Sequence, residues 1–274
     1  AASGCGNITL LRDFSAAPHE MLASLWRNRS LISVSIKREV LGRYRGSFLG
    51  IFWSLFNPVF MLAVYTFVFS VVFRARWGAG SDSKTEFALV LFAGLMVFNL
   101  FAECINRAPG IILTNTNYVK RVVYPLEILP WATLGSALLH AAISLIVWLG
   151  AYIIFFGVPH LTVLYIPLIL FPFVLFIMGI SWALASLGVF LRDVSQLIGM
   201  VTTALMFLSP IFYPITALPE NYRSYLYMSP LTPVIEQVRD VLYWGKAPDF
   251  SMLGIYLAAM LVVAWLGFAW FQKT

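Results

Sequence analysis

The sequence predicts an all-α polytopic membrane protein with six transmembrane helices, an N-terminal amphipathic interface helix, and re-entrant outer helices between spans five and six. Of its 274 residues, 61% are hydrophobic and 11% are charged, whereas soluble domains carry about 25% charged residues. The mean hydropathy is +0.86. Apolar runs long enough to cross a bilayer core of roughly 30 Å recur along the chain. Too little polar sequence remains for a large soluble catalytic domain.

Residues 1–48 are predicted to form a cytoplasmic tail followed by the amphipathic interface helix. Pro18 suits a helix start. Further on, Ile32, Ile36 and Val40 recur at four-residue spacing, with Lys and Arg residues around them. Such a pattern suits a helix that lies at the membrane surface with its cations toward lipid headgroups. An ordinary solvated juxtamembrane segment is the alternative.

The first span is expected at 49–73, a run of 25 uncharged residues that follows a short basic segment. Pro58 should kink it. The start of this span is unusual because phenylalanine recurs every four residues, and such a row stays on one helical face. The basic segment is Arg43, Tyr44 and Arg45, and the phenylalanine row is Phe48, Phe52, Phe56 and Phe60.

The remaining spans complete a six-span domain over residues 49–274. Glu103 lies near the end of the second span, where its carboxylate can reach the interface, and we favour this role over a proton relay. The loop between spans two and three is too patterned for a passive turn. The stretch between spans five and six is broken by prolines and suits two short amphipathic helices that partly re-enter the membrane. The spans are expected at about 87–105, 131–156, 161–191, 197–213 and 252–271, with the loop at 106–125 and the re-entrant region at 214–251.

The basic residues predict the orientation of the chain. With six spans, twelve of the 18 Lys and Arg residues fall on the side that holds both termini. The positive-inside rule therefore places both termini in the cytoplasm.

Known catalytic and nucleotide-binding motifs are not found in the sequence. There is no phosphate-binding loop, HExxH, CxxC or G-x-S-x-G pattern, and the two cysteines give no metal-site spacing. We therefore predict no catalytic residue, metal or cofactor in this chain. A transporter of this kind needs an energy source, so a separate subunit that hydrolyses nucleotide is expected.

Three motifs resemble the membrane subunit of type-2 ABC exporters of O antigen and related surface polysaccharides. They are RYRGSFLGIFWSLFNP (43–58), NTNYVKRVVYPLEILP (115–130) and FLRDVSQ…FLSPIFYP…LP (190–219), followed by SPLTP (229–233). Leu126 departs from the pattern, because an arginine is common there. The order and spacing of the motifs match from about residue 30 onward.

The resemblance implies a homodimer with two copies of a separate ATPase subunit, which would hold ATP and Mg. It implies a multi-pass protein of the bacterial inner membrane that exports a lipid-linked glycan, typically on an undecaprenyl carrier. It also implies a coupling helix in the 106–125 loop, and a channel between protomers lined by the first and fifth spans. Thr202 and Met206 are the residues of the fifth span expected to line it.

The phenylalanine row then gains a role, because sugar C–H faces stack on aromatic rings. We expect Tyr44 and the row to line the cytoplasmic mouth and the channel, with lipid-facing or core packing as the alternative. Arg43 and Arg45 are expected to contact either the carrier's phosphates or lipid headgroups. The residues expected to contact the ATPase are Asn117, Tyr118, Lys120 and Arg121.

Other functions remain as alternatives. One is a type-2 ABC exporter of capsule, teichoic acid or a small-molecule drug. A membrane-embedded glycosyltransferase or acyltransferase is a poorer fit, since Asp193 and His160 are expected on opposite sides of the membrane.

Overall fold

The computed structural model describes residues 18–44, 46–48, 50, 52–68, 77, 84–116 and 125–274. Within these ranges every regular element is a helix, which confirms the all-α prediction. The α-helices are α1 (Pro18–Arg27), α2 (Arg29–Tyr44), α3 (Phe52–Phe67), α4 (Lys84–Arg107), α5 (Ile111–Thr114), α7 (Leu129–Phe156), α8 (Ile166–Phe190), α9 (Val194–Leu208), α10 (Glu220–Met228), α11 (Leu231–Leu242) and α12 (Phe250–Lys273). Short 3₁₀ helices are η2 (Ala108–Gly110), η3 (Leu126–Ile128), η4 (Leu161–Tyr165) and η5 (Ile215–Ala217).

Four helical segments of the described chain are long and apolar enough to cross a membrane: Thr85–Thr114, Leu126–Phe156, Leu161–Phe190 and Phe250–Lys273. They coincide with the predicted second, third, fourth and sixth spans. The helices α3 and α9 are apolar but shorter, so the count of six spans stays a prediction. Helix α9 begins and ends earlier than the predicted 197–213. Ser209, which precedes Pro210, has ψ of 150°, because the proline ring disfavours helical backbone in the residue before it.

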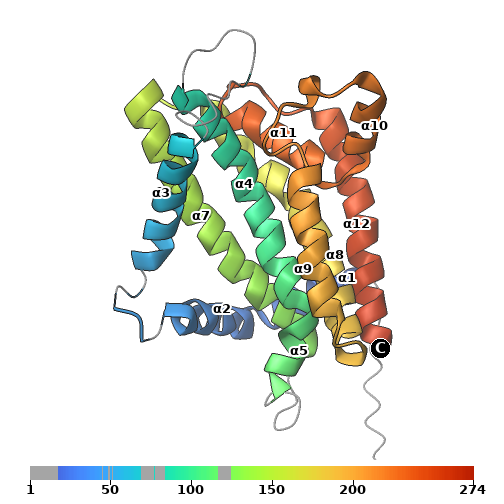
Figure 1. The fold of residues 1–274 in the computed structure, drawn as a ribbon. Coiled ribbons are helices and arrows are strands. Elements are labelled where there is room, and N and C mark those ends of the chain that lie inside the picture. Colours follow the sequence, from blue (N-terminus) through green and yellow to red (C-terminus); the bar gives the residue numbers. More distant parts are fainter. Residues whose placement is uncertain are drawn as a thin grey trace, which may run out of the picture.

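Helix α4 forms the centre of the bundle, and α3, α7, α9 and α11 all pack against it. Within an apolar stretch of 18 residues, 83% of the residues are buried in the α4 segment, compared with 11% in the α7 segment. Figure 1 shows α2 lying across the bundle at one end, near α5 and the C-terminus, and α10 and α11 at the other. We call these the α2 end and the α11 end.

Small residues let the long helices approach closely. A Cβ on Gly179 of α8 would lie 2.6 Å from the carbonyl oxygen of Val263 in α12. A Cβ on Gly267 of α12 would overlap the carbonyl of Gly179. Glycine is therefore required on both sides of the α8–α12 contact, as is typical of membrane helix pairs.

The helix predicted from the four-residue pattern is present as α2. Ile32 and Val40 are buried, and the helix packs on α7. Its Ile36 side chain occupies the space left open by Gly135, where a Cβ would overlap it. The N-terminal α1 is held by Ser24, whose hydroxyl donates a 3.0 Å hydrogen bond to Glu127.

At the α11 end, Arg239 joins three elements. Its side chain is 1% exposed. Nε donates to the carbonyl of Val90 in α4 (3.1 Å), while Nη1 and Nη2 donate to the carbonyls of Pro210 (2.6 Å) and Ile211 (2.7 Å). One guanidinium thus joins α11 to carbonyls of α4 and of the turn after α9.

The groups around Arg239 accommodate its positive charge. Nη1 lies 3.0 Å from Oε1 of Glu236, and the guanidinium carbon lies 4.4 Å from the Trp77 ring centroid. Gly94 makes room for the group, because a Cβ there would be 2.6 Å from Nη2. Burial lowers the pKa of Arg239 to about 10, so the guanidinium stays charged at neutral pH.

Candidate functional site

The junction between α2 and α3 turns the chain from a helix lying across the bundle into one running along it (Figure 1). Gly46 and Gly50 have φ of 84° and 52°. These are left-handed conformations that glycine adopts without the steric penalty of a Cβ. Phe48, between them, is fully exposed in the protomer.

The phenylalanine row continues on α3. Phe52, Phe56 and Phe60 are 68%, 49% and 51% exposed. The rings of Phe56 and Phe60 stack with centroids 5.8 Å apart, and Trp53 meets Phe56 edge to face at 5.4 Å. The row therefore shares one face of α3 and is not covered by the rest of the described chain. Its role in lining a channel stays a prediction.

At the end of α2 that leads into this row, a charged cluster joins α2, α4 and α7. Nη2 of Arg43 lies 2.5 Å from Oε1 of Glu103, and Nη1 lies 3.0 Å from Nδ1 of His140. The same Nδ1 is 3.1 Å from Oε2 of Glu103. The hydroxyl of Tyr44 lies 3.2 Å from Nε2 on the other side of the imidazole. We call these four residues the Arg43–Glu103 cluster.

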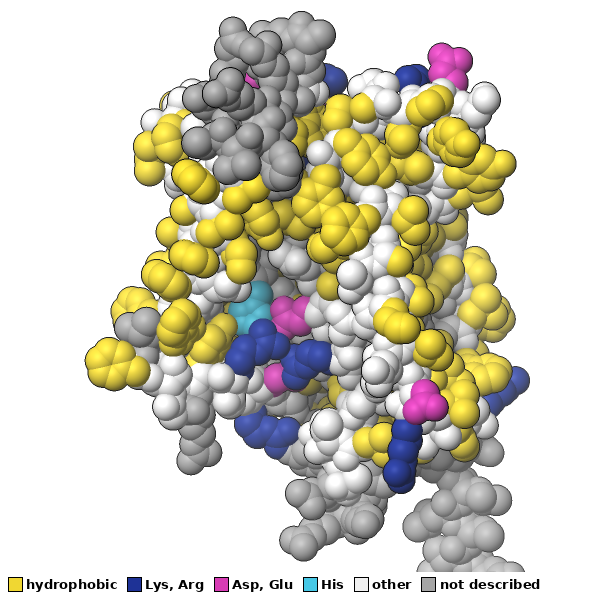
Figure 2. All heavy atoms as spheres, in the orientation of Figure 1, with side chains coloured by type: hydrophobic (Ala, Val, Ile, Leu, Met, Phe, Trp, Pro, Cys, Tyr) yellow, Lys and Arg dark blue, Asp and Glu magenta, His cyan; other side chains and the backbone are white. Residues whose placement is uncertain are grey.

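A second ion pair borders the cluster. Nη1 of Arg107 lies 2.6 Å from Glu39 and 3.8 Å from Glu103. Figure 2 shows basic, acidic and histidine side chains gathered in a hollow toward the α2 end, below a surface rich in hydrophobic side chains. Opposite charges therefore alternate across the hollow, which keeps each carboxylate beside a cation.

A cavity of about 840 Å³ lies against α2 and the junction. Lys37, Arg38 and Tyr44 contribute polar groups to its lining, and Leu41 and Val34 contribute apolar ones. Such a mixed lining suits an amphiphile that carries a negative charge.

The two residues predicted to line a channel from the fifth span face inward in the protomer. Thr202 is 4% exposed. Its hydroxyl lies 2.9 Å from Oδ1 of Asn106 and 2.7 Å from the carbonyl oxygen of Ile198. Met206 is half-buried against the core. Their channel role stays a prediction.

Several predicted site residues lie outside the described part of the chain. They are Arg45 in the basic segment and the expected ATPase contacts Asn117, Tyr118, Lys120 and Arg121. The described start of their loop forms η2 and α5, at the α2 end (Figure 1).

Two residues of the cluster were missed as functional candidates by the sequence. Glu103 was expected only to reach the interface, and His140 was not singled out. The signal that would have found them is that both are ionisable side chains within long apolar segments, where such groups are costly and usually paired.

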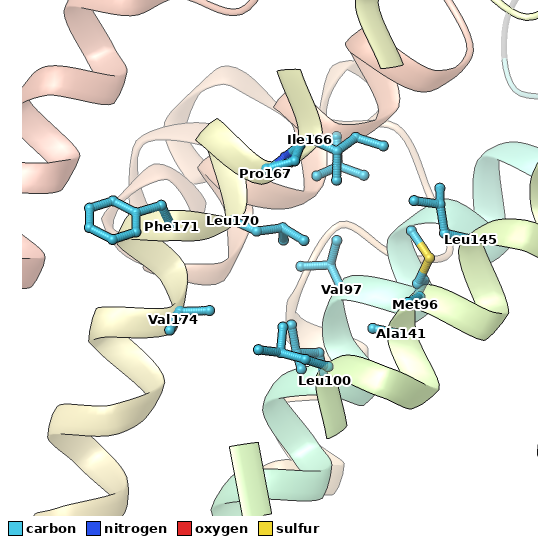
Figure 3. Close-up of a pocket in the computed structure, with 13 residues that line it drawn as sticks. Met96, Val97, Leu100, Ala141, Leu145, Ile166, Pro167, Leu170, Phe171 and Val174 are labelled. Atoms are coloured by element: carbon cyan, nitrogen blue, oxygen red, sulfur yellow. The ribbon is translucent and has the colours of Figure 1, made fainter. Parts of the chain in front are cut away.

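A further cavity, of about 430 Å³, lies between α4, α7 and α8 (Figure 3). Its lining side chains are all apolar, and Met96, Leu145 and Leu170 are among them. Those side chains include no hydrogen-bonding group, so this cavity offers only apolar contacts.

Comparison with known proteins adds the family. The sequence is 25% identical over 255 residues to the O-antigen export system permease protein RfbA of Myxococcus xanthus, covering 92% of this chain and 95% of that protein. It is 24% identical over 244 residues to RfbA of Klebsiella pneumoniae, covering 89% of this chain and 91% of the relative. It is 25% identical over 242 residues to the polysialic acid transport protein KpsM of Escherichia coli, covering 86% and 90%. The family described as ABC-2 type transporter matches residues 30–243, most of the chain. The protein therefore belongs to the ABC-2 type transporter family.

Proposed function

We propose that this chain is the permease subunit of an ATP-driven exporter that moves a lipid-linked surface polysaccharide across the bacterial inner membrane. The relatives are named for O-antigen export and for polysialic acid transport, so the proposal covers O-antigen-like and capsule-like polymers. The single observation that carries it is the uncovered aromatic row on α3 beside the charged cluster.

The aromatic row supplies what a moving glycan needs. Rings offer large contact area to sugar C–H faces without demanding a fixed hydrogen-bond geometry. A polymer that advances stepwise is best served by several similar weak sites, as ions are in a channel. Phe52, Phe56 and Phe60 provide three such sites at regular spacing on one face.

The α2 end supplies groups for the lipid carrier's phosphate. Arg43 and the cavity lined by Lys37 and Arg38 place positive charge where α2 meets α3. Apolar side chains of the same cavity suit the isoprenoid portion of a carrier. Headgroup contact remains the other role for Arg43 and Arg45.

The remaining parts of the proposal concern assembly. Two copies of this chain would form the channel, with the α3 and α9 surfaces facing each other. Two copies of a separate ATPase would bind ATP and Mg at the cytoplasmic side. We propose Asn117, Tyr118, Lys120 and Arg121 as its contacts. A cysteine at Tyr118 should cross-link to a copurified ATPase carrying surface cysteines, and a cross-link that never forms would remove this assignment.

The test of the main proposal is the double variant Phe52→Ala/Phe56→Ala. We expect lipid-linked glycan to accumulate inside cells and surface glycan to fall at least about tenfold, because two stacking contacts of about 1 kcal/mol each are lost. The matched control is Leu266→Ala/Trp270→Ala on α12, with the same four-residue spacing and 55% and 54% exposure. Normal export by the α3 variant, at normal protein level, would refute the role of the row.

A further inference from the structure

The Arg43–Glu103 cluster contains one atom with two incompatible neighbours. Nδ1 of His140 lies 3.0 Å from a guanidinium nitrogen of Arg43, which can only donate, and 3.1 Å from a carboxylate oxygen of Glu103, which can only accept. A neutral imidazole nitrogen can accept from the first or donate to the second, but not both. The imidazole therefore has two hydrogen-bonding states, and the position of Arg43 selects between them.

The surroundings isolate this choice from other ionisable groups. From α4, His140 faces Glu103, with Arg107 at 3.8 Å from that carboxylate. From α2 it faces Arg43 and Tyr44, while Glu39 pairs with Arg107.

The other helices that pack on α7 add little charge. Helix α8 has no ionisable side chain, α3 contributes only Tyr65 and α5 none, and the Glu127 carboxylate of η3 accepts from Ser24. With a neutral imidazole, the two guanidinium groups and the two carboxylates balance.

We propose that Glu103 is the resting counter-ion of Arg43, and that Arg43 exchanges it for a substrate phosphate while His140 takes up a proton in its place. This inference rests on the proposed function and concerns how the same site is regulated. In the resting state Nδ1 accepts from Arg43, and Nε2–H donates to the Tyr44 oxygen. In the bound state Arg43 donates to the phosphate, and the doubly protonated imidazole donates through Nδ1 to Glu103.

The exchange follows from the cost of an unpaired carboxylate. The Glu103 side chain is only 20% exposed and that of His140 only 17%, so losing the guanidinium leaves a poorly hydrated negative charge. Histidine gains a proton near neutral pH, and its imidazole is already within hydrogen-bond distance. The Arg43 side chain is 35% exposed, which makes it the member of the pair that can reach an outside ligand.

The proposal predicts the direction in which ligand affinity changes with pH. If binding takes up a proton, the dissociation constant of the phosphate ligand rises with pH, by at most about tenfold per pH unit for one proton. A structural role for His140 would change stability without linking ligand binding to proton uptake.

The experiment uses the full chain with its ATPase, without nucleotide, in phosphatidylcholine nanodiscs. The probe is farnesyl diphosphate, and titration calorimetry in two buffers of different ionisation enthalpy counts the protons taken up on binding. We expect net proton uptake on binding, of up to one proton per site. His140→Gln should bind the probe without proton uptake.

Matched variants distinguish the proposed exchange from a general loss of structure. His160→Gln removes an imidazole just beyond the C-terminal end of α7, where the ring packs against Tyr152, and it should keep the proton uptake. Glu103→Gln removes the competing counter-ion, so we expect tighter binding, by tenfold or more, and little dependence on pH. Phosphatidylglycerol in the nanodiscs distinguishes the source of the phosphate, because an equal proton uptake from this lipid alone would mean that the site reads a membrane headgroup.

Farnesyl diphosphate that binds without proton uptake, or an uptake that persists in His140→Gln, would overturn the exchange and leave the proposed export function standing. The export function is judged separately by glycan accumulation in the α3 variant. Absence of any Arg43-dependent binding of either phosphate lipid would also overturn the exchange.

Discussion

Replacing Arg239 by methionine tests the most heavily bonded buried charge of the described structure. The variant removes the donors to the carbonyls of Val90, Pro210 and Ile211 and leaves them buried without a charged partner. Removing one member of a buried ionic network costs about 3–5 kcal/mol, and each hydrogen bond to a charged group contributes roughly 1.5–3 kcal/mol without simple additivity. We therefore expect the free energy of unfolding to fall by about 3–5 kcal/mol.

The assay is thermal unfolding of the purified protein in one detergent. At roughly 2–4 °C per kcal/mol for a chain of this order of size, Tm should fall by about 6–20 °C. The matched control is Arg223→Met, because Arg223 also donates to two carbonyls, those of Leu218 and Thr216, but is only half-buried. That variant should cost less than about 1 kcal/mol.

Arg239→Lys should have an intermediate effect. Arg239→Lys keeps the charge, but an ammonium is a compact point charge and cannot span three carbonyls as the planar guanidinium does. Its Tm should lie between the wild type and Arg239→Met. Equal Tm shifts for Arg239→Met and Arg223→Met would refute the view that this network holds the α11 end together.

Three further outcomes are expected. Gly94→Ala should lower Tm because its Cβ would lie 2.6 Å from the buried guanidinium, whereas Gly254→Ala, with open space around its Cβ, should be neutral or stabilising; equal effects would contradict the close approach. Gly267→Ala should separate α8 from α12 and cost about 1–3 kcal/mol by overpacking, measured as reduced yield of monodisperse protein, and a normal yield would count against that contact. Asp249→Ala should cost about 1 kcal/mol in thermal unfolding, because the carboxylate accepts from the first backbone N–H groups of α12; Asp249→Asn should be nearly neutral, and an equal loss in both variants would exclude capping as the cause.

The sequence was sufficient for the elements whose signal is local. The long apolar runs located α4, α7, α8 and α12, and the four-residue pattern located α2 and the phenylalanine row. Hydropathy measures transfer out of water, but it does not say which neighbour a helix meets. The α4 and α7 segments have the same mean hydropathy of 2.2. Yet 83% of the apolar stretch in the α4 segment is buried, compared with 11% in the α7 segment.

The sequence alone does not predict which distant side chains pair in the fold. Arg43 and Glu103 are 60 positions apart, and Arg43 and His140 are 97 apart, so no local pattern joins them. Nothing in the local sequence distinguishes Arg239 from the other cations outside the predicted spans, whereas the fold buries it against three carbonyls. In both cases the arrangement of helices determines the partners.

The short length of α9 has a consequence for the membrane itself. A helix of 15 residues is about 22 Å long, roughly 8 Å less than the hydrocarbon core. As the predicted fifth span, it would require the bilayer beside it to thin or the helix to be shielded from lipid, since hydrophobic mismatch carries a cost for every ångström. Helix α9 packs against α4. In the proposed exporter, a polar chain would therefore cross the thinnest part of the apolar layer alongside the central helix.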